Sequence, residues 1–275
     1  MLETAKFPPF VISTFYNAQF SNLPINHNLQ ETYIMLQPWQ TATVIKIEQQ
    51  TYNTRRFFIQ MPEETAFDFK PGQFVTLDLP IHEKPNKRLR SYSIASWPDG
   101  SNVFELCIVL LDGGAGTTYL FNEIKEGSQL TLRGPVGVFT LDEHALKEDL
   151  FLICTGTGIA PFRSMSNYIK LHNLSHKNIY LLFGCRTKAD LLYFEELKAL
   201  SDSMPNFHYI PTLSREQWEG ANGYVHEVYE NILMVNGKAP ANFMLCGWRA
   251  MIDEAKLRII NLGYDRKAVH SELYG

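Results

Sequence analysis

The segment Arg90–Ser96 combines a fixed cation, an aromatic ring and small hydroxyl groups on one short stretch of chain. Side chains two apart on a strand share a face, so Arg90 and Tyr92 are expected on one face, with Ser93 on the other unless the strand ends there. A guanidinium binds phosphate as a fork, a tyrosine ring stacks on planar rings, and a serine hydroxyl hydrogen-bonds a heteroatom. These requirements occur together in a flavin nucleotide, although an ordinary half-buried strand is the alternative interpretation of this segment alone.

A second chemical signal is the stretch Thr155–Pro161, which directly follows the apolar run Leu150–Cys154. Its two glycines allow the backbone to approach a ligand closely. The helix expected after them offers unpaired N–H groups and a positive dipole end to a pyrophosphate. Pro161 suits the first helical turn, but it replaces the third glycine of the usual dinucleotide fingerprint. A tight strand–helix turn is the alternative; the position at the first turn of a parallel sheet favours a nucleotide.

Three later strand ends carry polar or reactive side chains, at Arg186, at Ser214-Arg215 and at Cys246-Gly247. Because ligands of parallel α/β sheets bind beyond the carboxyl ends of the strands, these residues are candidates for the same nucleotide. Both arginines can bind phosphate on the adenosine side, and a solvated strand-end arginine is an equally good interpretation for Arg186. Ser214 favours a functional role for Arg215, since a serine and an arginine can share a ribose 2′-phosphate.

Composition limits the class of protein. The 275 residues carry a net charge of −4, so no global field favours nucleic acid or an anionic membrane. The first residues lack the features of a secretory signal, and no apolar run approaches the length of a membrane span. The four cysteines are widely separated and form no CxxC pair, which indicates reduced thiols and no iron–sulfur cluster of the chain's own. We therefore expect a cytoplasmic protein with two domains.

Hydrophobic patterning divides the chain into two parts of different fold class. From about residue 41 to residue 139, short alternating or apolar runs are separated by turn residues, which is typical of an antiparallel β-barrel or sandwich. The expected strands are Ala42–Ile47, Thr54–Gln60, Gln73–Leu79, Arg90–Ala95, Val103–Leu111 and Gln129–Arg133. One short helix is expected at Thr118–Ile124.

After Glu148, continuous apolar strands alternate with helical periods, the rhythm of a doubly wound parallel sheet. The expected strands are Leu150–Thr155, Ile179–Cys185, Phe207–Leu213 and Phe243–Gly247. The expected helices are Ala160–Leu171, Ala189–Leu200, Tyr224–Met234 and Arg249–Leu262. A polar stretch, 141–147, separates the two patterns, so domains are expected at 41–143 and 147–275. Residues 1–40 fit neither pattern and are expected to form an arm that packs on the barrel.

Together these segments resemble the ferredoxin–NADP reductase-like flavoproteins over roughly residues 41 to 275. Arg90, Tyr92 and Ser93 match the family's flavin motif RxYS, and Gly156–Pro161 matches its nicotinamide-nucleotide loop GTGxAP. In the first half, Gly114–Thr117 resembles the family's second flavin-phosphate segment, and Gly134–Phe139 resembles the turn that ends the family's barrel. In the second half, Cys246-Gly247 matches the family's CG pair, and Glu272 and Tyr274 resemble its terminal acid and aromatic residue. The matched segments occur in the family's order.

The resemblance implies a flavin-binding antiparallel barrel followed by a doubly wound α/β domain. It implies hydride transfer between a nicotinamide C4 and a flavin N5, and then electron release to a separate carrier protein such as a ferredoxin, a flavodoxin or an oxygenase component. The implied cofactors are FAD, with FMN also found among relatives, and NADPH or NADH. The implied cofactor-binding residues are Arg90, Ser91, Tyr92, Ser93, Gly116, Thr117, Thr118, Thr155, Gly156, Thr157, Gly158, Pro161, Arg186, Ser214, Arg215, Cys246, Gly247 and Tyr274.

The resemblance also implies individual roles within that set. Arg90 and Thr117 bind the flavin pyrophosphate, Tyr92 stacks on the isoalloxazine ring, and Ser93 lies near N5. The implied catalytic residues are Ser93, Cys246 and Glu272, of which the last two flank the hydride path. Tyr274 covers the flavin face that the nicotinamide must reach, although Gly275 follows it, so it departs from a true terminal tyrosine.

Several features leave alternatives open. Ser214-Arg215 favours NADPH, whereas Trp218–Gly220 is similar to NADH-using relatives. The basic run Lys84–Arg88 is either a solvated loop or a docking patch for an acidic electron carrier. The alternative functions are a non-enzymatic nucleotide-binding regulatory subunit and a diaphorase with small-molecule acceptors. His172 and His176 have a metal-binding spacing but bracket an expected helix end, so no metal site is expected.

Overall fold

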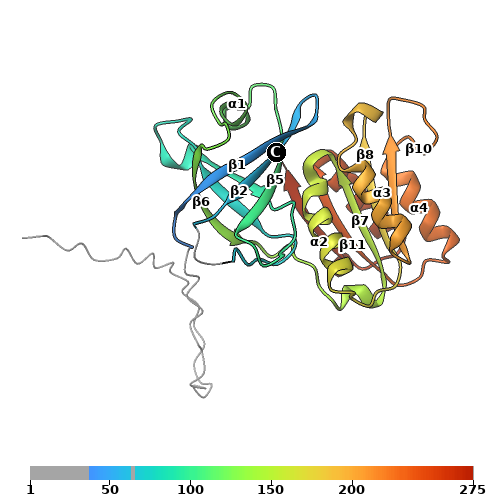
Figure 1. The fold of residues 1–275 in the computed structure, drawn as a ribbon. Helices are drawn as coiled ribbons and strands as arrows, with labels where there is room; N and C mark the ends of the chain where they lie inside the picture. The colour runs from blue at the N-terminus through green and yellow to red at the C-terminus, as the bar shows by residue number, and fades with distance from the viewer. Residues whose placement is uncertain (1–36, 63–65, 275) are drawn as a thin grey trace, which may run out of the picture. The chain divides into compact units, whose positions relative to one another are not determined.

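The computed structural model describes residues 37–62 and 66–274. These residues form two six-stranded sheets, one antiparallel and one parallel, with helices packed around the second (Figure 1). The arm expected at residues 1–40 and its packing lie outside the described residues, apart from the last positions before the first strand. No helix in the described ranges is both long and apolar enough to cross a membrane.

The first sheet is the antiparallel barrel that the sequence predicts. Its strands are β1 (Gln40–Thr51), β2 (Thr54–Gln60), β3 (Phe74–Asp78), β4 (Leu89–Ser93), β5 (Val103–Val109) and β6 (Gln129–Val136), in the order β4-β3-β6-β1-β2-β5. A β-bridge between Ile94, just after β4, and Leu106 of β5 joins the first and last strands of this order and closes the sheet into a barrel. Inward-facing residues such as Val44, Phe57 and Ile59 fill its apolar core.

Helix α1 (Ala115–Asn122) begins earlier than the expected range Thr118–Ile124. Its first turn is closed by Thr117, whose hydroxyl donates to the Gly114 carbonyl and accepts from the Leu111 N–H, both at 3.1 Å. Such local side-chain bonds do not show in apolar periodicity, so the pattern placed the start too late. The earlier start puts Gly116 and Thr117 in the first turn of the helix.

The second sheet is parallel and doubly wound, as predicted. Its strands are β7 (Asp149–Thr155), β8 (Ile179–Cys185), β9 (Phe207–Leu213), β10 (Ala221–Asn222), β11 (Ala241–Trp248) and β12 (Val269–Tyr274), in the order β10-β9-β8-β7-β11-β12. Its helices are α2 (Ile159–Leu171), α3 (Phe194–Ser203), α4 (Val225–Val235) and α5 (Arg249–Asn261). Leu152 of β7 packs in the core that contains α2 and α3, and Phe151 packs in the core that contains α4 and α5. Helices therefore cover both faces of the sheet.

The second half differs from the expected elements in one helix and in two additional strands. The helix expected at Ala189–Leu200 is a 3₁₀ turn, Lys188–Asp190, followed by α3. A capping box between Thr187 and Asp190 closes that turn, and Tyr193 has a left-handed φ of +55°, so a continuous helix cannot form. The sequence pattern also missed β10 and β12. Strand β12 lies at a sheet edge with exposed and half-buried side chains, so it lacks the continuous apolar run of a central strand. The remaining 3₁₀ turns are Pro85–Lys87, Ala145–Lys147, Gly156–Gly158 and Arg266–Ala268.

Candidate functional site

Strand β4 holds the Arg90–Ser93 segment at one edge of the barrel order, paired with β3. Ser93 is 4% exposed, whereas Arg90 and Tyr92 are half-buried. Burial raises the pKa of the Tyr92 phenol to about 12, against the effect of Arg90, so the ring stays neutral. Tyr92 packs on the barrel core and keeps part of its surface exposed, which leaves it available to a planar ligand. Ser91 is exposed, and its hydroxyl lies 3.0 Å from that of Thr76.

Arg90 lies against the first turn of α1. A Cβ at Gly116 would come within 2.9 Å of Arg90 Cγ, so glycine permits this close approach. The helix has no side-chain cap, and the Thr118 N–H is bonded to the Gly114 carbonyl at 2.9 Å. The N–H groups before Thr118 therefore lie beside a guanidinium, an arrangement suited to a pyrophosphate. The Thr117 hydroxyl already has two partners in the protein, which leaves its backbone N–H as the group that can meet an anion.

The glycine turn lies where the strand order of the parallel sheet reverses, between β7 and β11, the usual ligand position in such sheets. Gly156 has a φ of +54°, and a Cβ at Gly158 would lie 2.4 Å from the Cys246 carbonyl oxygen. Pro161 is buried in the first turn of α2, and that helix has no side-chain cap. The first N–H groups of this helix have no side-chain cap, and Gly158 packs against the end of β11, so the structure brings the turn and Cys246-Gly247 together.

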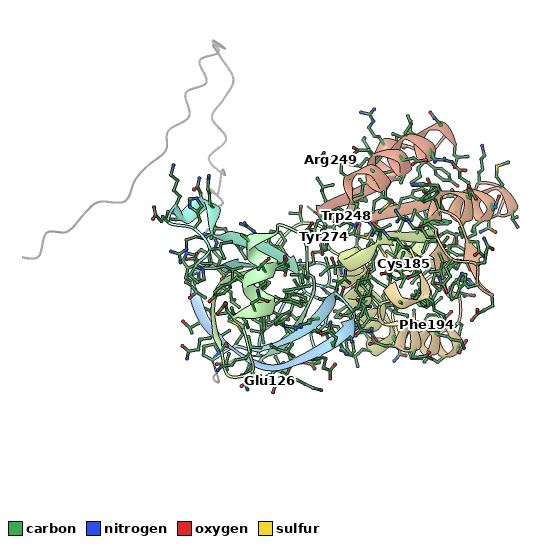
Figure 2. The ribbon with its side chains drawn as sticks, turned by 90° about the horizontal axis from the view of Figure 1, so that it is seen from above. Glu126, Cys185, Phe194, Trp248, Arg249 and Tyr274 are labelled. Carbon is green, nitrogen blue, oxygen red and sulfur yellow. The ribbon has the colours of Figure 1, made fainter. Side chains whose placement is uncertain are left out.

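Trp248 ends one of the strand-end segments that the sequence points to, but the sequence interpretation gave it no role. Its side chain is half-exposed, and its indole Nε1 lies 3.7 Å from the position that a Cβ on Gly156 would occupy. Its backbone N–H donates to Thr155 Oγ1 at 3.4 Å, and it pairs in register with Tyr274 on β12 (Figure 2). The available signal was an aromatic residue directly after the Cys246-Gly247 pair at a strand end.

One hydrogen bond joins the barrel to the carboxyl ends of the parallel strands. Ser93 Oγ donates to Glu272 Oε1 at 2.6 Å, and Glu272 pairs in register with Cys246. Burial raises the pKa of the Glu272 carboxyl, and the bond from Ser93 opposes that shift. Burial also raises the pKa of the Cys246 thiol well above its usual range, so the thiol stays protonated near neutral pH. The structure thus brings together Ser93, Cys246 and Glu272.

Tyr274 completes this junction. Its ring packs against the core that contains α2, and its buried hydroxyl lies beside Ser93 and Cys246 without a hydrogen bond of good geometry to either. Burial holds the pKa of that hydroxyl well above its usual range. A buried unpaired hydroxyl costs about 1–3 kcal/mol, which either a ligand atom or a movement of the ring would relieve. The close approach of Gly158 to β11 and the cation beside α1 fit two bound dinucleotides.

The raised pKa of Glu272 predicts a pH-dependent stability. Folding favours the protonated carboxyl, so its contribution is complete below about pH 4.5 and is lost as the pH rises through the higher folded-state value. The difference in melting temperature between the wild type and Glu272→Gln should therefore become less favourable to the wild type as the pH is raised from about 4 to about 8. Thermal unfolding of both proteins at several pH values measures this, with the exposed Glu123→Gln as control. A difference that grows with pH would show that the fold favours the carboxylate.

Arg186, Ser214 and Arg215 lie together at the ends of β8 and β9. The Arg215 N–H donates to the Arg186 carbonyl at 2.9 Å, and both arginines are exposed. The carboxylate of Glu216 lies at the same edge, where it accepts the Lys188 N–H at 2.8 Å. This end of the sheet therefore offers cations for a 2′-phosphate and a carboxylate for ribose hydroxyls.

Two features lie outside this site. A cavity of about 650 Å³ is lined by parts of segments 68–73 and 140–143 and by Tyr168 and His172 of the α2 end, and it contains none of the predicted cofactor residues. The His172 ring packs on Tyr168 at 4.2 Å between centroids, and His176 Nδ1 lies 2.6 Å from the Lys177 carbonyl. Among the residues that the structure describes, no cluster of three or more His, Cys, Asp or Glu side chains suits a metal ion.

Comparison with known proteins gives the family. Residues 41–141 match the model of an oxidoreductase FAD-binding domain, and residues 152–256 match that of an oxidoreductase NAD-binding domain. Ferredoxin–NADP reductase B of Sorangium cellulosum (strain So ce56) is 35% identical over 248 residues, which cover 88% of this chain and 99% of that protein. The glycine betaine monooxygenase reductase subunit of Pseudomonas aeruginosa (strain UCBPP-PA14) is 31% identical over 84% of this chain, but the match covers 63% of its own length.

Solved structures show the same fold. A ferredoxin–NADP⁺ reductase from Neisseria gonorrhoeae with bound FAD and NADP superposes with a TM-score of 0.72 at 24% identity, covering 86% of this chain and 98% of that one. A cytochrome P450 reductase from Amycolatopsis gives a TM-score of 0.75 at 24% identity, covering 86% of this chain and 70% of that one. The chain therefore belongs to the ferredoxin–NADP reductase-like flavoproteins and is an NAD(P)H-dependent reductase that uses FAD.

Proposed function

We propose that this reductase transfers a hydride from NADPH or NADH to FAD at the Ser93–Glu272 junction and then passes electrons singly to a ferredoxin, a flavodoxin or an oxygenase component. The observation that carries the proposal is the 2.6 Å bond between the barrel strand and the end of the parallel sheet. The acceptor class is supported by relatives named as a ferredoxin–NADP reductase and as a reductase or electron transfer component of oxygenases. Residues 41–143 would bind FAD, and residues 147–275 would bind the nicotinamide nucleotide.

FAD supplies the redox chemistry, since it accepts a hydride and returns electrons one at a time. The chain binds and orients the two cofactors. Arg90 and the first turn of α1 bind the flavin pyrophosphate, and Tyr92 orients the ring system. The N-terminus of α2 binds the pyrophosphate of the nicotinamide nucleotide. Ser93 presents its hydroxyl at the junction, and Glu272, with its raised pKa, holds or releases a proton beside it.

Anaerobic stopped-flow reduction with NADH and NADPH in parallel tests this function. The purified protein should be yellow and should bleach with either nucleotide, faster with NADPH because exposed Arg186 and Arg215 can pair with a 2′-phosphate. A colourless protein that binds no added FAD would contradict the proposal and support a regulatory subunit. Reduction of ferricyanide without reduction of any carrier protein would instead support a diaphorase.

The run Lys84–Arg88 is the surface proposed to dock an acidic carrier. Lys84 and Lys87 are exposed at the two ends of the 3₁₀ turn that precedes β4, Lys84 just before it and Lys87 as its last residue, whereas Arg88 is paired with Asp78 at 2.7 Å. The two lysines therefore carry positive charge close in sequence to the flavin strand. A negatively charged carrier would be attracted to this position.

Reversing both charges, Lys84→Glu with Lys87→Glu, should slow the reduction of an acidic ferredoxin roughly tenfold at low ionic strength. The effect should shrink as salt screens the charges. Carrier reduction measured across a salt series tests this, with Lys177→Glu and Lys238→Glu, two exposed lysines of the second half, as the matched double control. Equal rates for the two double variants would remove this surface as the docking site.

A cytoplasmic location is the last part of the proposal. All four cysteines are free thiols, and three of them are buried. Reducing compartments keep thiols in this state. Cell fractionation with a tagged full-length chain tests the location, and recovery outside the cytoplasm would contradict it.

A further inference from the structure

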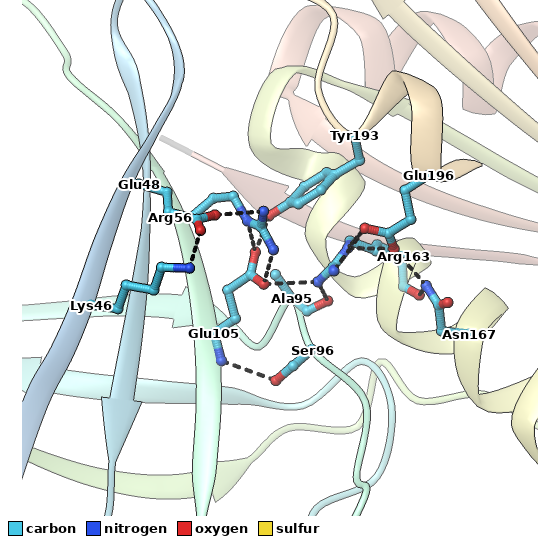
Figure 3. A network of polar contacts seen from close by, with 10 residues as sticks. All are labelled: Lys46, Glu48, Arg56, Ala95, Ser96, Glu105, Arg163, Asn167, Tyr193 and Glu196. Atoms are coloured by element: carbon cyan, nitrogen blue, oxygen red, sulfur yellow. Dashed lines mark hydrogen bonds and ion pairs between the residues drawn. The ribbon is translucent and has the colours of Figure 1, made fainter. Parts of the chain in front are cut away.

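A buried cluster of charged side chains joins the barrel to the α/β half (Figure 3). Its centre is Glu105 on β5, which is 2% exposed, and Arg163 on α2, which is 4% exposed. Arg163 Nη1 lies 3.1 Å from Glu105 Oε2. Arg56 on β2 donates to both oxygens of the same carboxylate, at 2.8 and 2.7 Å, and the Tyr193 hydroxyl donates to Oε1 at 2.5 Å. One carboxylate of the barrel is thus bound from both halves of the protein.

The cluster also holds the chain that continues from the flavin strand. Arg163 Nη1 donates to the Ala95 carbonyl at 2.9 Å, and the Ala95 N–H donates to the Glu105 carbonyl at 2.8 Å. The opposite side of the same guanidinium binds Glu196 of α3, at 2.8 Å from Nε to Oε1 and 2.8 Å from Nη2 to Oε2. Arg163 therefore connects α2, α3 and the residue two positions after Ser93.

Burial of Glu105 by itself raises its pKa, but the bonds and charges of Arg56 and Arg163 outweigh burial and hold it below its usual range. The carboxyl thus stays ionised in a place almost without water. Buried ion pairs contribute little net stability, because desolvating both partners offsets their attraction. They do impose one geometry, since removing a single partner leaves an unpaired buried charge, which is strongly unfavourable. The cluster is therefore better explained by a fixed arrangement of the two halves than by stability.

Tyr193 shows that the chain accepts local strain to complete the cluster. Its φ of +55° is left-handed, a conformation that is unfavourable for a bulky residue. Its ring lies 4.4 Å from the Arg163 guanidinium carbon, and its side chain is 3% exposed. A strained residue of this kind persists only where its surroundings determine its position.

The cluster is tied to both cofactor segments by short, rigid pieces of chain. Ala95 lies two residues beyond the end of β4, and Gly158 precedes Arg163 by about 7.5 Å of rise along the start of α2. We propose that Glu105 and Arg163 are positioning residues for hydride transfer, which fix the separation between the flavin strand and the glycine turn without touching either cofactor. The inference rests on the proposed function. Hydride transfer needs reacting atoms about 3–3.5 Å apart, and a misplacement of about 1 Å can cost about 100-fold in rate.

The test compares FAD-loaded wild type with Glu105→Gln and Arg163→Lys. Glu105→Gln keeps the shape of the side chain but removes its charge, and Arg163→Lys keeps the charge but loses the fork that binds Ala95 and Glu196. Anaerobic stopped-flow separates the limiting rate of flavin reduction from the dissociation constant of the nucleotide. We expect the limiting rate to fall roughly 10- to 100-fold, with a much smaller change in the dissociation constant. The long-wavelength charge-transfer absorbance of stacked nicotinamide and flavin should weaken in parallel.

The matched control is Arg258→Lys on α5, which also disrupts arginine–carboxylate pairs, with Glu230 and Glu254, but lies wholly within the α/β half. It should leave both the rate and the charge-transfer band unchanged. Tyr193→Phe, which removes only the hydroxyl, carries the test if Glu105→Gln does not fold. Folded variants with wild-type limiting rate and band overturn the inference. A wild type that neither nucleotide reduces overturns the proposed function itself, which is a different result.

Discussion

Replacing Arg90 with alanine is expected to weaken FAD binding roughly 10- to 100-fold and to give protein that loses its yellow colour on dilution. The half-buried guanidinium lies against the first turn of α1, whose N–H groups have no side-chain cap. A hydrogen bond between a charged group and a phosphate in such a place is worth about 1.5–3 kcal/mol. Titration of apoprotein with FAD, followed by flavin fluorescence, measures the dissociation constant.

Two variants sharpen this result. Arg90→Lys keeps the charge but not the bidentate fork, so its affinity should lie between those of the wild type and the alanine variant. Arg55→Ala is the matched control, because Arg55 donates to the Phe121 carbonyl at 2.8 Å, at the other end of the same helix. It should retain FAD. Equal losses of FAD affinity in Arg55→Ala and Arg90→Ala would mean that α1 needs both basic residues for its stability and that Arg90 has no special role. An unchanged FAD affinity in Arg90→Ala would mean that the pyrophosphate binds elsewhere.

The sequence could predict those parts of the site whose chemistry is local. Arg90, Tyr92 and Ser93 are defined by two-residue alternation, and the glycine turn is defined by a buried strand, two small residues and a helix start. Each of these signals lies within about ten neighbouring residues. The order of an antiparallel barrel and then a parallel sheet follows from the same local patterns, and the structure confirms it.

Contacts between distant segments could not be predicted in this way. Ser93 and Glu272 are separated by 179 positions, and the strand that carries Glu272 has no apolar run to reveal it. Tyr193 was expected inside a helix because its neighbours have helical spacing, but its φ is left-handed and its hydroxyl donates to Glu105, 88 positions away. The buried partners of Glu105 and Arg163 likewise come from separate elements, so no single segment contains the signal. The family resemblance implied Ser93, Cys246 and Glu272 for one hydride path, but the contacts that hold the two halves together need the structure.

Replacing Gly158 with alanine should lower the limiting rate of flavin reduction by about 100-fold while FAD stays bound. The new Cβ would lie 2.4 Å from the Cys246 carbonyl oxygen and 2.8 Å from the Gly247 nitrogen, and neither backbone atom can move without the end of β11. Gly158 has φ −61° and ψ −8°, which alanine adopts freely, so the effect is steric rather than conformational. The required shift of about 1 Å falls between the turn and the Cys246-Gly247 pair that are proposed to hold the nicotinamide.

Gly184→Ala is the matched control at the end of the neighbouring strand β8. Its Cβ would come closest to side-chain methyl groups, of Val225 at 3.0 Å and Thr155 at 3.2 Å, which can give way by small rotations, and its nearest backbone atom, the Cys154 carbonyl oxygen, lies at an ordinary contact distance of 3.7 Å. Its limiting rate should stay close to that of the wild type, as should the FAD content of both variants. A Gly158→Ala protein that is reduced as fast as Gly184→Ala would show that the spacing between the glycine turn and β11 does not govern the reaction. A selective loss in Gly158→Ala would instead tie hydride transfer to that spacing, because the two substitutions add the same methyl group and differ only in what it meets.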